Sequence, residues 1–294
     1  IGRWLVVAVS KERWRGKDRI ATFMPNDKGT DSMTFTPVEV VDGMLDLLPE
    51  EIWSNPDIKF LDIFCKSGVF LERIYWRLEK GLKEQIPNFM DRSDHILTKQ
   101  LYGLVPKEEL AIYYARPIVY GRYDIDHEKS FIDKFNDKEG NIKVAVRTVD
   151  DYEYDITEVI QDKTGIMFRD MIKEAFGEMK FDVVVGNPPY NKGMDLDFVN
   201  RGFDLCDKYC VMITPAKWQT AADDYTGCAS KTIDYRGFRE KLVPHMSKVV
   251  LYPQSTELFN IYQIDGITYF KLDKQNVHDK CTVVNKCKVQ PLIN

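Results

Sequence analysis

The segment from Phe181 to Gly186 constrains the fold more strongly than any other part of the chain. Its sequence, Phe-Asp-Val-Val-Val-Gly, is short, rich in β-branched residues and closed by glycine. This composition is typical of a strand that is buried on both faces of a parallel sheet. In open α/β folds, ligands bind just beyond the carboxyl ends of such strands. The sequence therefore predicts an α/β protein whose functional residues include those that follow Gly186.

The next four residues, Asn187-Pro188-Pro189-Tyr190, have the chemistry needed to hold a planar amine. An aromatic amine is a poor nucleophile because its lone pair is delocalised into the ring, and acceptors that bind its hydrogens make the nitrogen more nucleophilic. The side-chain carbonyl of Asn187 and the main-chain carbonyl of Pro188 are such acceptors, held in a stiff turn by two prolines. Tyr190 adds a flat face for stacking, worth about 1–3 kcal/mol. The same four residues are also typical of an ordinary turn after a strand.

A second motif runs from Phe60 to Leu78 and predicts a strand, a tight turn and a helix. Asp62 stands at the end of the strand, and Gly68 in the turn permits a close approach of the backbone. Main-chain N–H groups at a helix start favour a carboxylate, whereas Asp62 favours an ammonium group. The turn could therefore take the amino-acid end of S-adenosylmethionine. Other nucleotide-binding α/β units begin in the same way, so this motif alone is a weak signal.

A third motif precedes the other two and predicts a capped helix. Thr36 is a natural N-cap, Pro37 suits the first helical position, and Glu39 completes a capping box. By itself this motif indicates a helix and nothing more. The expected buried stripe consists of Val40, Val41, Met44, Leu45 and Leu48.

In this order, the three motifs resemble the gamma-class amino-methyltransferases of DNA restriction-modification systems. The resemblance is closest to the adenine-N6 methylase domains that are often fused to restriction endonucleases or helicases. It extends from about residue 34 to about residue 273, with 209–218 as the strand after the catalytic loop and 257–271 as a closing antiparallel pair. It implies a Rossmann-like class I methyltransferase fold, with a mostly parallel seven-stranded sheet, an antiparallel last strand and helices on both faces.

The resemblance also implies roles for individual residues. The catalytic residues Asn187 to Tyr190 would hold an adenine flipped out of DNA, with Pro188 and Pro189 between them. Asp124 and Asp126 are alternatives for one carboxylate near the adenine ring of the cofactor. Either residue could equally belong to an acidic loop facing water. The expected cofactor-binding residues are Phe35, Thr36 and Pro37 beside the methionine part of S-adenosylmethionine, Asp62, Phe64, Lys66 and Gly68 at its amino-acid end, and Asp124 or Asp126 near its adenine ring.

Two residues depart from the pattern of the resembled family. Many relatives have glycine at the position of Lys66, so this side chain must either point away or act on a carboxylate or phosphate. The second strand, 100–105, usually ends in an acidic residue that binds the cofactor ribose, and here Val105 takes that place. Glu108 or Glu109 could substitute from the following helix.

Composition agrees with an enzyme inside the cell. The chain has 294 residues, 44% of them hydrophobic, which is enough for one α/β domain with additions. No apolar stretch approaches the roughly 18 residues of a membrane span, and no leader is present, so we expect a cytoplasmic protein without membrane contact. The six cysteines show no paired spacing, which argues against a metal site. Cys206 and Cys210 are expected as small buried residues on a helix at 197–207 and just after it.

The net charge of −5 is the main argument against a nucleic-acid substrate, because phosphate contacts need Lys and Arg. An arm from Arg3 to Arg19 is nevertheless basic, with Trp4 and Trp14 interleaved. This arm could lie along a DNA backbone or form a solvated helix face, and the sequence leaves both interpretations open.

The predicted organisation is that of a piece of a larger enzyme. We expect a basic arm or linker at 1–33, the methyltransferase domain at 34–275 and a tail at 276–294. An acidic, turn-rich insertion at about 120–165 is expected to contain a hairpin, and the polar segment 219–235 to act as a substrate loop. The chain opens inside an apolar run without methionine, which suggests a fused or associated nuclease, helicase or target-recognition domain.

Three functions follow from these observations. The first is S-adenosylmethionine-dependent methylation of adenine N6 in DNA, as the methylase part of a restriction-modification enzyme. The second keeps the chemistry but changes the substrate to a glutamine side-chain amide in a protein, because the same Asn-Pro-Pro-Tyr loop occurs in such enzymes. The third is a catalytically weak DNA-binding or cofactor-binding module of a larger restriction enzyme, for which Lys66 and Val105 are the support.

Overall fold

The computed structural model describes residues 35–106, 115, 118–119, 146–148, 156–177, 180–259 and 263–286. The predicted arm at 1–33 lies outside these residues, as do Asp124, Asp126 and most of the insertion. The predicted hairpin of that insertion is also outside them, apart from Val146, where strand β3 begins.

The described strands form one sheet in the order β3-β2-β1-β4-β5-β7-β6-β8. Strands β1 to β5 pair in parallel with one another, whereas β7 is antiparallel to both β5 and β6. The predicted α/β fold, a mostly parallel sheet with a reversed strand near its end, is confirmed. The strands are β1 (Phe60–Asp62), β2 (Leu101–Val105), β3 (Val146–Thr148), β4 (Phe181–Gly186), β5 (Cys206–Pro215), β6 (Met246–Tyr252), β7 (Ile267–Asp273) and β8 (Thr282–Asn285).

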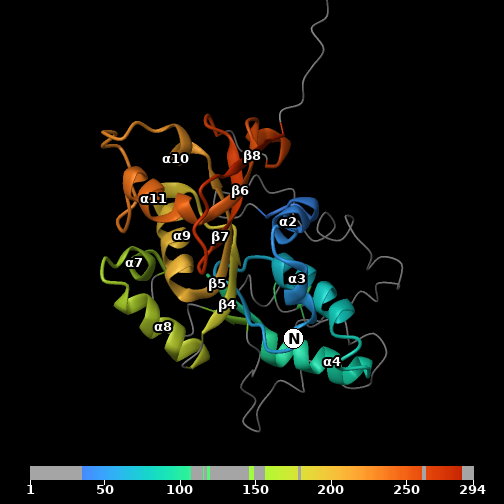
Figure 1. Cartoon of the computed structure of the whole chain (residues 1–294). Helices are drawn as coiled ribbons and strands as arrows, with labels where there is room; N and C mark the ends of the chain where they lie inside the picture. Colours follow the sequence, from blue (N-terminus) through green and yellow to red (C-terminus); the bar gives the residue numbers. More distant parts are fainter. Residues whose placement is uncertain are drawn as a thin grey trace, which may run out of the picture.

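Helices cover both faces of this sheet (Figure 1). Helices α2 and α3 pack on one face, and α8, α9 and α11 pack on the other. The α-helices are α2 (Val38–Leu45), α3 (Val69–Gly81), α4 (Phe89–His95), α7 (Ile156–Gln161), α8 (Ile166–Phe176), α9 (Met194–Leu205), α10 (Lys217–Thr220) and α11 (Tyr235–Leu242). Short helices are η3 (Glu50–Ser54), η4 (Ile96–Gln100), η9 (Asn191–Gly193), η10 (Val243–His245) and η11 (Ser255–Glu257). Among the described helices, none is long and apolar enough to cross a bilayer.

Strand β4 lies in the middle of the sheet and is buried on both faces. Val183 and Val185 belong to the core under α2 and α3, whereas Phe181 and Val184 belong to the core under α8 and α9. Because both faces are covered, the strand needs apolar residues at successive positions and not only at alternate ones. Asp182 is the partly exposed exception.

An eighth strand joins the seven that were expected. Strand β8 pairs in parallel with β6, and it lies within the segment predicted to be a tail. Its residues are mostly exposed, because it forms the edge of the sheet and packs little of its surface. The four residues Thr-Val-Val-Asn therefore carry neither the alternation nor the continuous apolar run by which a strand is recognised in sequence.

The helix predicted at 197–207 is wrong in its bounds. Helix α9 begins after Gly193, whose φ of 70° marks the turn into it, and it ends at Leu205. Cys206 and Cys210 consequently lie in β5, where residues four apart share a face. Both are buried in the same core, so the prediction of two small buried residues is confirmed.

The predicted strand at 257–259 is also wrong, because this segment lies in and after the short helix η11. Besides β5, the antiparallel partner of β7 is β6, in which Tyr252 pairs with Ile267. Pro253 follows directly and has no N–H to donate, so the ladder ends there.

Candidate active site

The turn after β1 and the loop after β4 leave the sheet at the same edge. The two strands are parallel neighbours, with Asp62 in register with Val185. The N–H of Ile63 also donates to the carbonyl of Val185 at 3.1 Å. Because parallel strands end on the same side, two motifs that are far apart in the sequence meet here.

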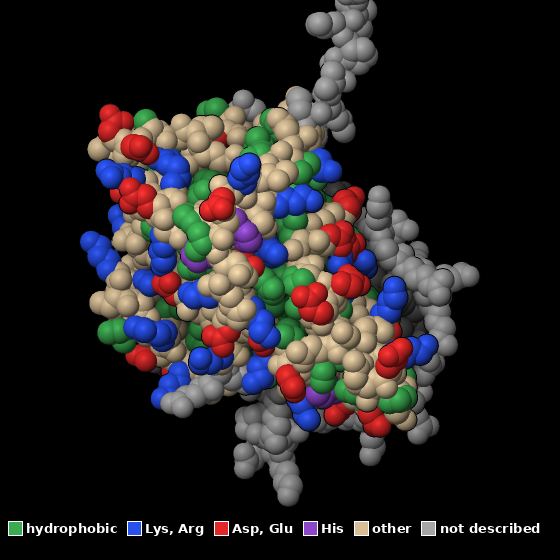
Figure 2. Space-filling view, viewed as in Figure 1, with side chains coloured by type: hydrophobic (Ala, Val, Ile, Leu, Met, Phe, Trp, Pro, Cys, Tyr) green, Lys and Arg blue, Asp and Glu red, His purple; other side chains and the backbone are tan. Residues whose placement is uncertain are grey.

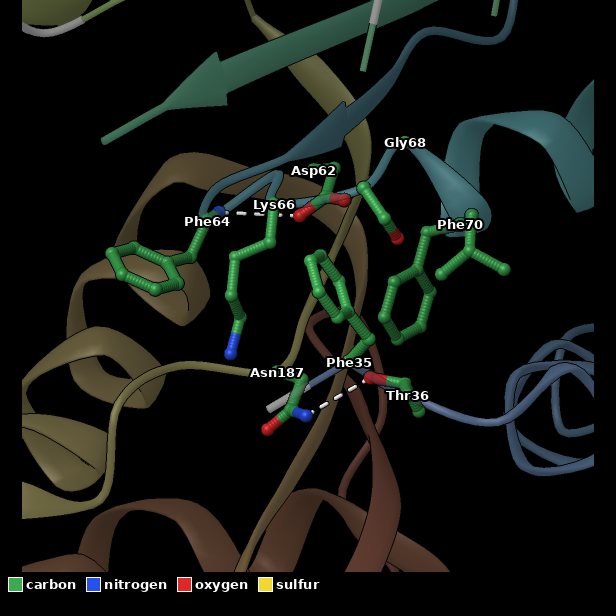
Figure 3. A pocket seen from close by; sticks show the side chains of 10 residues that line it. Phe35, Thr36, Asp62, Phe64, Lys66, Gly68, Phe70 and Asn187 are labelled. Carbon is green, nitrogen blue, oxygen red and sulfur yellow. Dashed lines mark hydrogen bonds between the residues drawn. The ribbon is translucent and has the colours of Figure 1, made fainter. Parts of the chain in front are cut away.

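A cavity with about 220 Å³ of empty volume, its opening included, lies between these segments (Figure 3). Six predicted site residues of the second and third motifs line it, together with Asn187. Sequence reasoning had not singled out Ser67, Val69 and Phe70. The lining residues are Phe35, Thr36, Asp62, Phe64, Lys66, Ser67, Gly68, Val69, Phe70 and Asn187.

Gly68 shapes the turn that forms one wall of the cavity. Its φ is 78°, a conformation that other residues rarely adopt, and it is the N-cap of α3. A Cβ at this position would lie 3.0 Å from the carbonyl oxygen of Ala115 and 3.0 Å from a methyl group of Val119. Glycine is therefore required both by the turn and by the close packing behind it.

Asp62 and Lys66 bring opposite charges into the cavity. Asp62 is 2% exposed and Lys66 is 7% exposed. Burial raises the pKa of Asp62 to about 7, although its carboxylate accepts a hydrogen bond from the N–H of Phe64 at 3.2 Å. Burial lowers the pKa of Lys66 to about 8, and nearby Asp62 opposes this shift. The amine of Lys66 points into the cavity, toward the side on which Asn187 lies, so the side chain does not turn away (Figure 3).

Replacement of Asp62 by asparagine is expected to stabilise the protein at pH 8 and to have little effect at pH 4. The pKa of this carboxyl rises from 3.8 to about 7 on burial, so the folded state keeps a proton that the unfolded state releases between these values. The free energy of unfolding therefore falls as the pH rises through this window. Asparagine does not ionise and removes that loss.

Urea denaturation of the wild type and of Asp62→Asn at pH 4, 6 and 8 measures this effect. We expect the difference in unfolding free energy to grow with pH to about 2–4 kcal/mol. A difference that stays constant from pH 4 to pH 8 would show that the carboxyl is not held protonated in the folded state.

Asn187 is 3% exposed and has its two amide atoms in different situations. Its Nδ2 donates to Oγ1 of Thr36 at 2.9 Å, across 151 positions of sequence. Its Oδ1 is buried and has no hydrogen-bond partner among the described residues. A buried acceptor without a partner is costly, and such a group in a cavity is a candidate contact for a ligand donor.

The capping box predicted at Thr36 is wrong. Pro37 is the N-cap of α2, its carbonyl accepts from the N–H groups of Val40 and Val41, and no side chain caps the helix. The helix therefore begins one residue later than predicted, and the Thr36 hydroxyl faces Asn187 instead. The predicted buried stripe of α2, from Val40 to Leu48, is confirmed.

Tyr190 lies at the other side of the loop and is partly exposed. Its ring meets that of Phe259 edge to face, with 6.5 Å between centroids. Its hydroxyl is buried and has no hydrogen-bond partner among the described residues. Burial raises the pKa of this hydroxyl well above its ordinary value, and the neighbouring Asp195 adds to the shift. Of the two rings, Phe259 is buried and Tyr190 is the one that is partly exposed.

The segment 219–235, predicted to be a substrate loop, is anchored beside the catalytic loop. Asp197 in α9 is fully buried and accepts hydrogen bonds from five donor atoms. A Cβ on Gly193, just after the catalytic loop, would lie 2.2 Å from the main-chain nitrogen of Ser230. The middle of the loop, 222–227, is exposed, and Tyr225 accepts a hydrogen bond from Lys217 at 2.9 Å. The donors to Asp197 are Ser230 Oγ, Lys231 N, Thr232 N, Thr232 Oγ1 and Gln161 Nε2.

Val105 is fully buried at the end of β2. The position expected to carry a ribose-binding carboxylate is therefore part of the apolar core. Glu108 and Glu109, the predicted substitutes, lie outside the described residues.

Comparison with known proteins identifies the family. The Eco57I restriction-modification methylase family matches residues 99–236. An "uncharacterized adenine-specific methylase" of Mycoplasma pneumoniae (strain ATCC 29342 / M129 / Subtype 1) is 30% identical over 327 residues, which cover 93% of this chain and 74% of the relative. The chain belongs to the adenine-specific methylases. As a member of this family, the methylase uses a methyl donor.

Solved structures show the same fold in this methylase. The ATP-dependent Type ISP restriction-modification enzyme LlaBIII, bound to DNA, has a TM-score of 0.53 and 16% identity, over 86% of this chain and 20% of that chain. A modification subunit of a candidate type I restriction enzyme from Vibrio vulnificus YJ016 has a TM-score of 0.55 and 14% identity, over 93% of this chain and 51% of that chain. The methylase thus spans about a fifth and about a half of these two chains.

Proposed function

We propose that this methylase transfers the methyl group of S-adenosylmethionine to N6 of adenine in DNA, as the methylase part of a restriction-modification enzyme. The observation that carries the proposal is Oδ1 of Asn187, which is buried and has no hydrogen-bond partner among the described residues, at the edge of a cavity that contains one carboxylate and one amine. The acceptor suits the amine to be methylated, and the cavity suits the amino-acid end of the donor.

Asn187 and Pro188 are proposed to activate the amine. Oδ1 of Asn187 and the main-chain carbonyl of Pro188 would each accept one of the two N6 hydrogens, which draws the nitrogen lone pair out of conjugation with the ring. Thr36 fixes the direction of Oδ1, because it accepts the hydrogen bond of Nδ2. Bound S-adenosylmethionine supplies a methyl group on a positively charged sulfur, which is a good leaving group. Catalysis then rests on positioning and hydrogen bonding.

The cofactor roles predicted from the sequence stay proposals, and the cavity supports several of them. Phe35, Thr36 and Pro37 would border the methionine part, and the first two of these line the cavity. The end with the ammonium and carboxylate would lie at the turn after β1. The turn at Gly68 fits this role. A side chain at this position would meet Ala115 and Val119, so glycine is needed for the backbone turn that forms this wall of the cavity. The residues proposed at the turn are Asp62, Phe64, Lys66 and Gly68, and Asp124 or Asp126 would meet the cofactor adenine.

The target adenine is proposed to be flipped out of the duplex and to stack on Tyr190, at a cost of a few kcal/mol for unstacking. Tyr190→Ala should raise KM for DNA about 5–100-fold, because a base–aromatic stack is worth about 1–3 kcal/mol. Tyr190→Phe should retain near wild-type KM and kcat, because it keeps the ring and removes only the buried hydroxyl that has no partner among the described residues. Steady-state kinetics on a duplex containing the target site measures both. Equal losses in the two variants would contradict stacking as the role of this residue.

A filter assay with S-adenosylmethionine labelled in its methyl group tests the function. We expect label in duplex DNA, and N6-methyladenine after nuclease digestion. Label in protein but not in DNA would favour the glutamine-amide alternative. Absent transfer with measurable cofactor binding would favour the catalytically weak binding module. Family membership favours the DNA substrate over the glutamine amide. The buried Oδ1 of Asn187, which has no hydrogen-bond partner among the described residues, favours catalysis over a weak binding module.

DNA is the proposed partner, together with a nuclease, helicase or target-recognition domain that is fused or associated. The exposed loop 222–227 beside the catalytic loop supports a contact with DNA, because it carries Tyr225 under the amine of Lys217, 4.5 Å from the ring centroid. Figure 2 shows that Lys and Arg side chains on the visible face are interspersed with acidic ones. The reaction is proposed to take place in the cytoplasm, where cellular DNA and S-adenosylmethionine are found.

A further inference from the structure

The ten residues that line the cavity include two ionisable side chains, one of each sign. Asp62 is the acid and Lys66 is the base, and the other eight are neutral. A ligand with both an ammonium and a carboxylate would offer each of them an opposite charge. Buried charges are tolerated when they are paired and hydrogen-bonded, so this cavity is complementary to a zwitterion.

Lys66 is held in the cavity by its surroundings. It is 7% exposed, although a lysine elsewhere usually keeps its amine in water. Its Nζ lies 5.4 Å from the centre of the Phe64 ring, which flanks the side chain. The pKa of Lys66 is lowered to about 8, so the amine still carries its proton for the most part at neutral pH. A protonated amine in this place is a donor for a carboxylate or a phosphate, and the donor molecule proposed above contains only the former.

We propose that Lys66 binds the carboxylate of the cofactor's amino-acid end, while Asp62 binds its ammonium. This inference rests on the proposed use of S-adenosylmethionine, and it assigns to one side chain the preference for a cofactor that carries a carboxylate. Asp62 ends β1 and Lys66 lies four positions later in the turn, and both line the cavity, with the amine of Lys66 on the side of Asn187 (Figure 3). Lys66 is therefore a binding and specificity residue, and it takes no part in the proposed activation of the target amine.

Isothermal titration calorimetry with four ligands tests the inference. S-adenosylmethionine and S-adenosylhomocysteine carry the carboxylate, decarboxylated S-adenosylmethionine lacks it, and 5′-methylthioadenosine lacks the whole amino-acid end. The wild type should bind S-adenosylmethionine about 10–100-fold more tightly than its decarboxylated form, the range expected for one charge-assisted hydrogen bond. In Lys66→Met, which keeps most of the apolar length, this ratio should fall to about 3-fold or less.

Controls separate binding from folding. Lys248→Met changes an exposed lysine of β6 and should leave all four dissociation constants unchanged. Lys66→Arg keeps a cation and should keep more of the preference for the carboxylate than Lys66→Met does. If Lys66→Met does not fold, as judged by circular dichroism and thermal unfolding, Lys66→Gln replaces it with the same expected loss of preference.

The outcomes are distinct. The inference is supported if Lys66→Met weakens the binding of S-adenosylmethionine and S-adenosylhomocysteine alone and leaves that of 5′-methylthioadenosine unaffected. Equal weakening of all ligands, or an unchanged preference in Lys66→Met, overturns it while the proposed cofactor stands. Failure of the wild type to bind any of the four overturns the proposed cofactor and this inference together.

Discussion

Asn187→Ala is expected to lower kcat for DNA methylation about 10²–10³-fold, while the dissociation constant for S-adenosylmethionine changes less than about 3-fold. The magnitude is that found when one preorganised hydrogen-bonding group is removed from a catalytic site. Oδ1 of Asn187 is buried and has no partner among the described residues, so it is ready to accept from the substrate amine. Single-turnover methylation of a labelled duplex and calorimetry with the cofactor measure the two quantities.

Thr36→Val serves as the matched control for this variant. Valine has nearly the same shape as threonine but cannot accept the hydrogen bond that Asn187 donates at 2.9 Å. The amide carbonyl then remains in the site but is less well oriented, so we expect a smaller loss, about 10-fold in kcat. If Asn187→Ala retained full methylation while it still bound the cofactor, the proposed mechanism would be wrong.

Asp197→Ala is expected to lower the free energy of unfolding by about 3–5 kcal/mol, the largest stability effect we predict. The fully buried carboxylate accepts hydrogen bonds from five donor atoms, four of them in the segment 230–232 and one in Gln161. Alanine at position 197 would leave the buried donors among these five atoms without an acceptor. Urea denaturation followed by circular dichroism measures the loss.

Asp204→Ala is the matched control, because it removes a carboxylate from the same helix α9 at an exposed position. Asp204 pairs with Lys241 at 2.8 Å, and their side chains are 47% and 41% exposed, so its removal should cost less than about 1 kcal/mol. Asp197→Asn keeps one acceptor oxygen and should fall between the two. Similar unfolding free energies for Asp197→Ala and Asp204→Ala would show that the network adds no stability beyond that of a surface pair.

Much of the fold was predictable because it depends on local patterns. The continuous apolar run of β4 predicted a central strand, and the burial of that strand on both faces confirms the reason. The glycine turn before α3 and the buried stripe of α2 were predictable for the same reason, since each follows from the residue types of one short segment. Strand β8 was not predictable, because an exposed edge strand carries little pattern of its own.

One error arose because a residue could satisfy its hydrogen bonds in more than one way. The sequence around Thr36 fits a capping box, yet its hydroxyl faces an amide 151 positions away. The role of Asp197 was not predictable for the same reason. In the sequence it is an ordinary acidic residue in the first turn of α9, and only the fold brings the segment 230–232 against it.

The sequence by itself determined that strand β4 is buried, that a stiff Asn-Pro-Pro-Tyr loop follows it, and that a glycine turn opens α3. Local sterics, β-branching and apolar runs are enough for this, because each acts within a few residues. Only the tertiary structure decided that Thr36 orients Asn187, that Oδ1 of Asn187 is left as a buried acceptor, and that Lys66 enters the cavity with Asp62. These features depend on which polar atoms are brought together and which are denied water, and that is set by the packing of the whole domain.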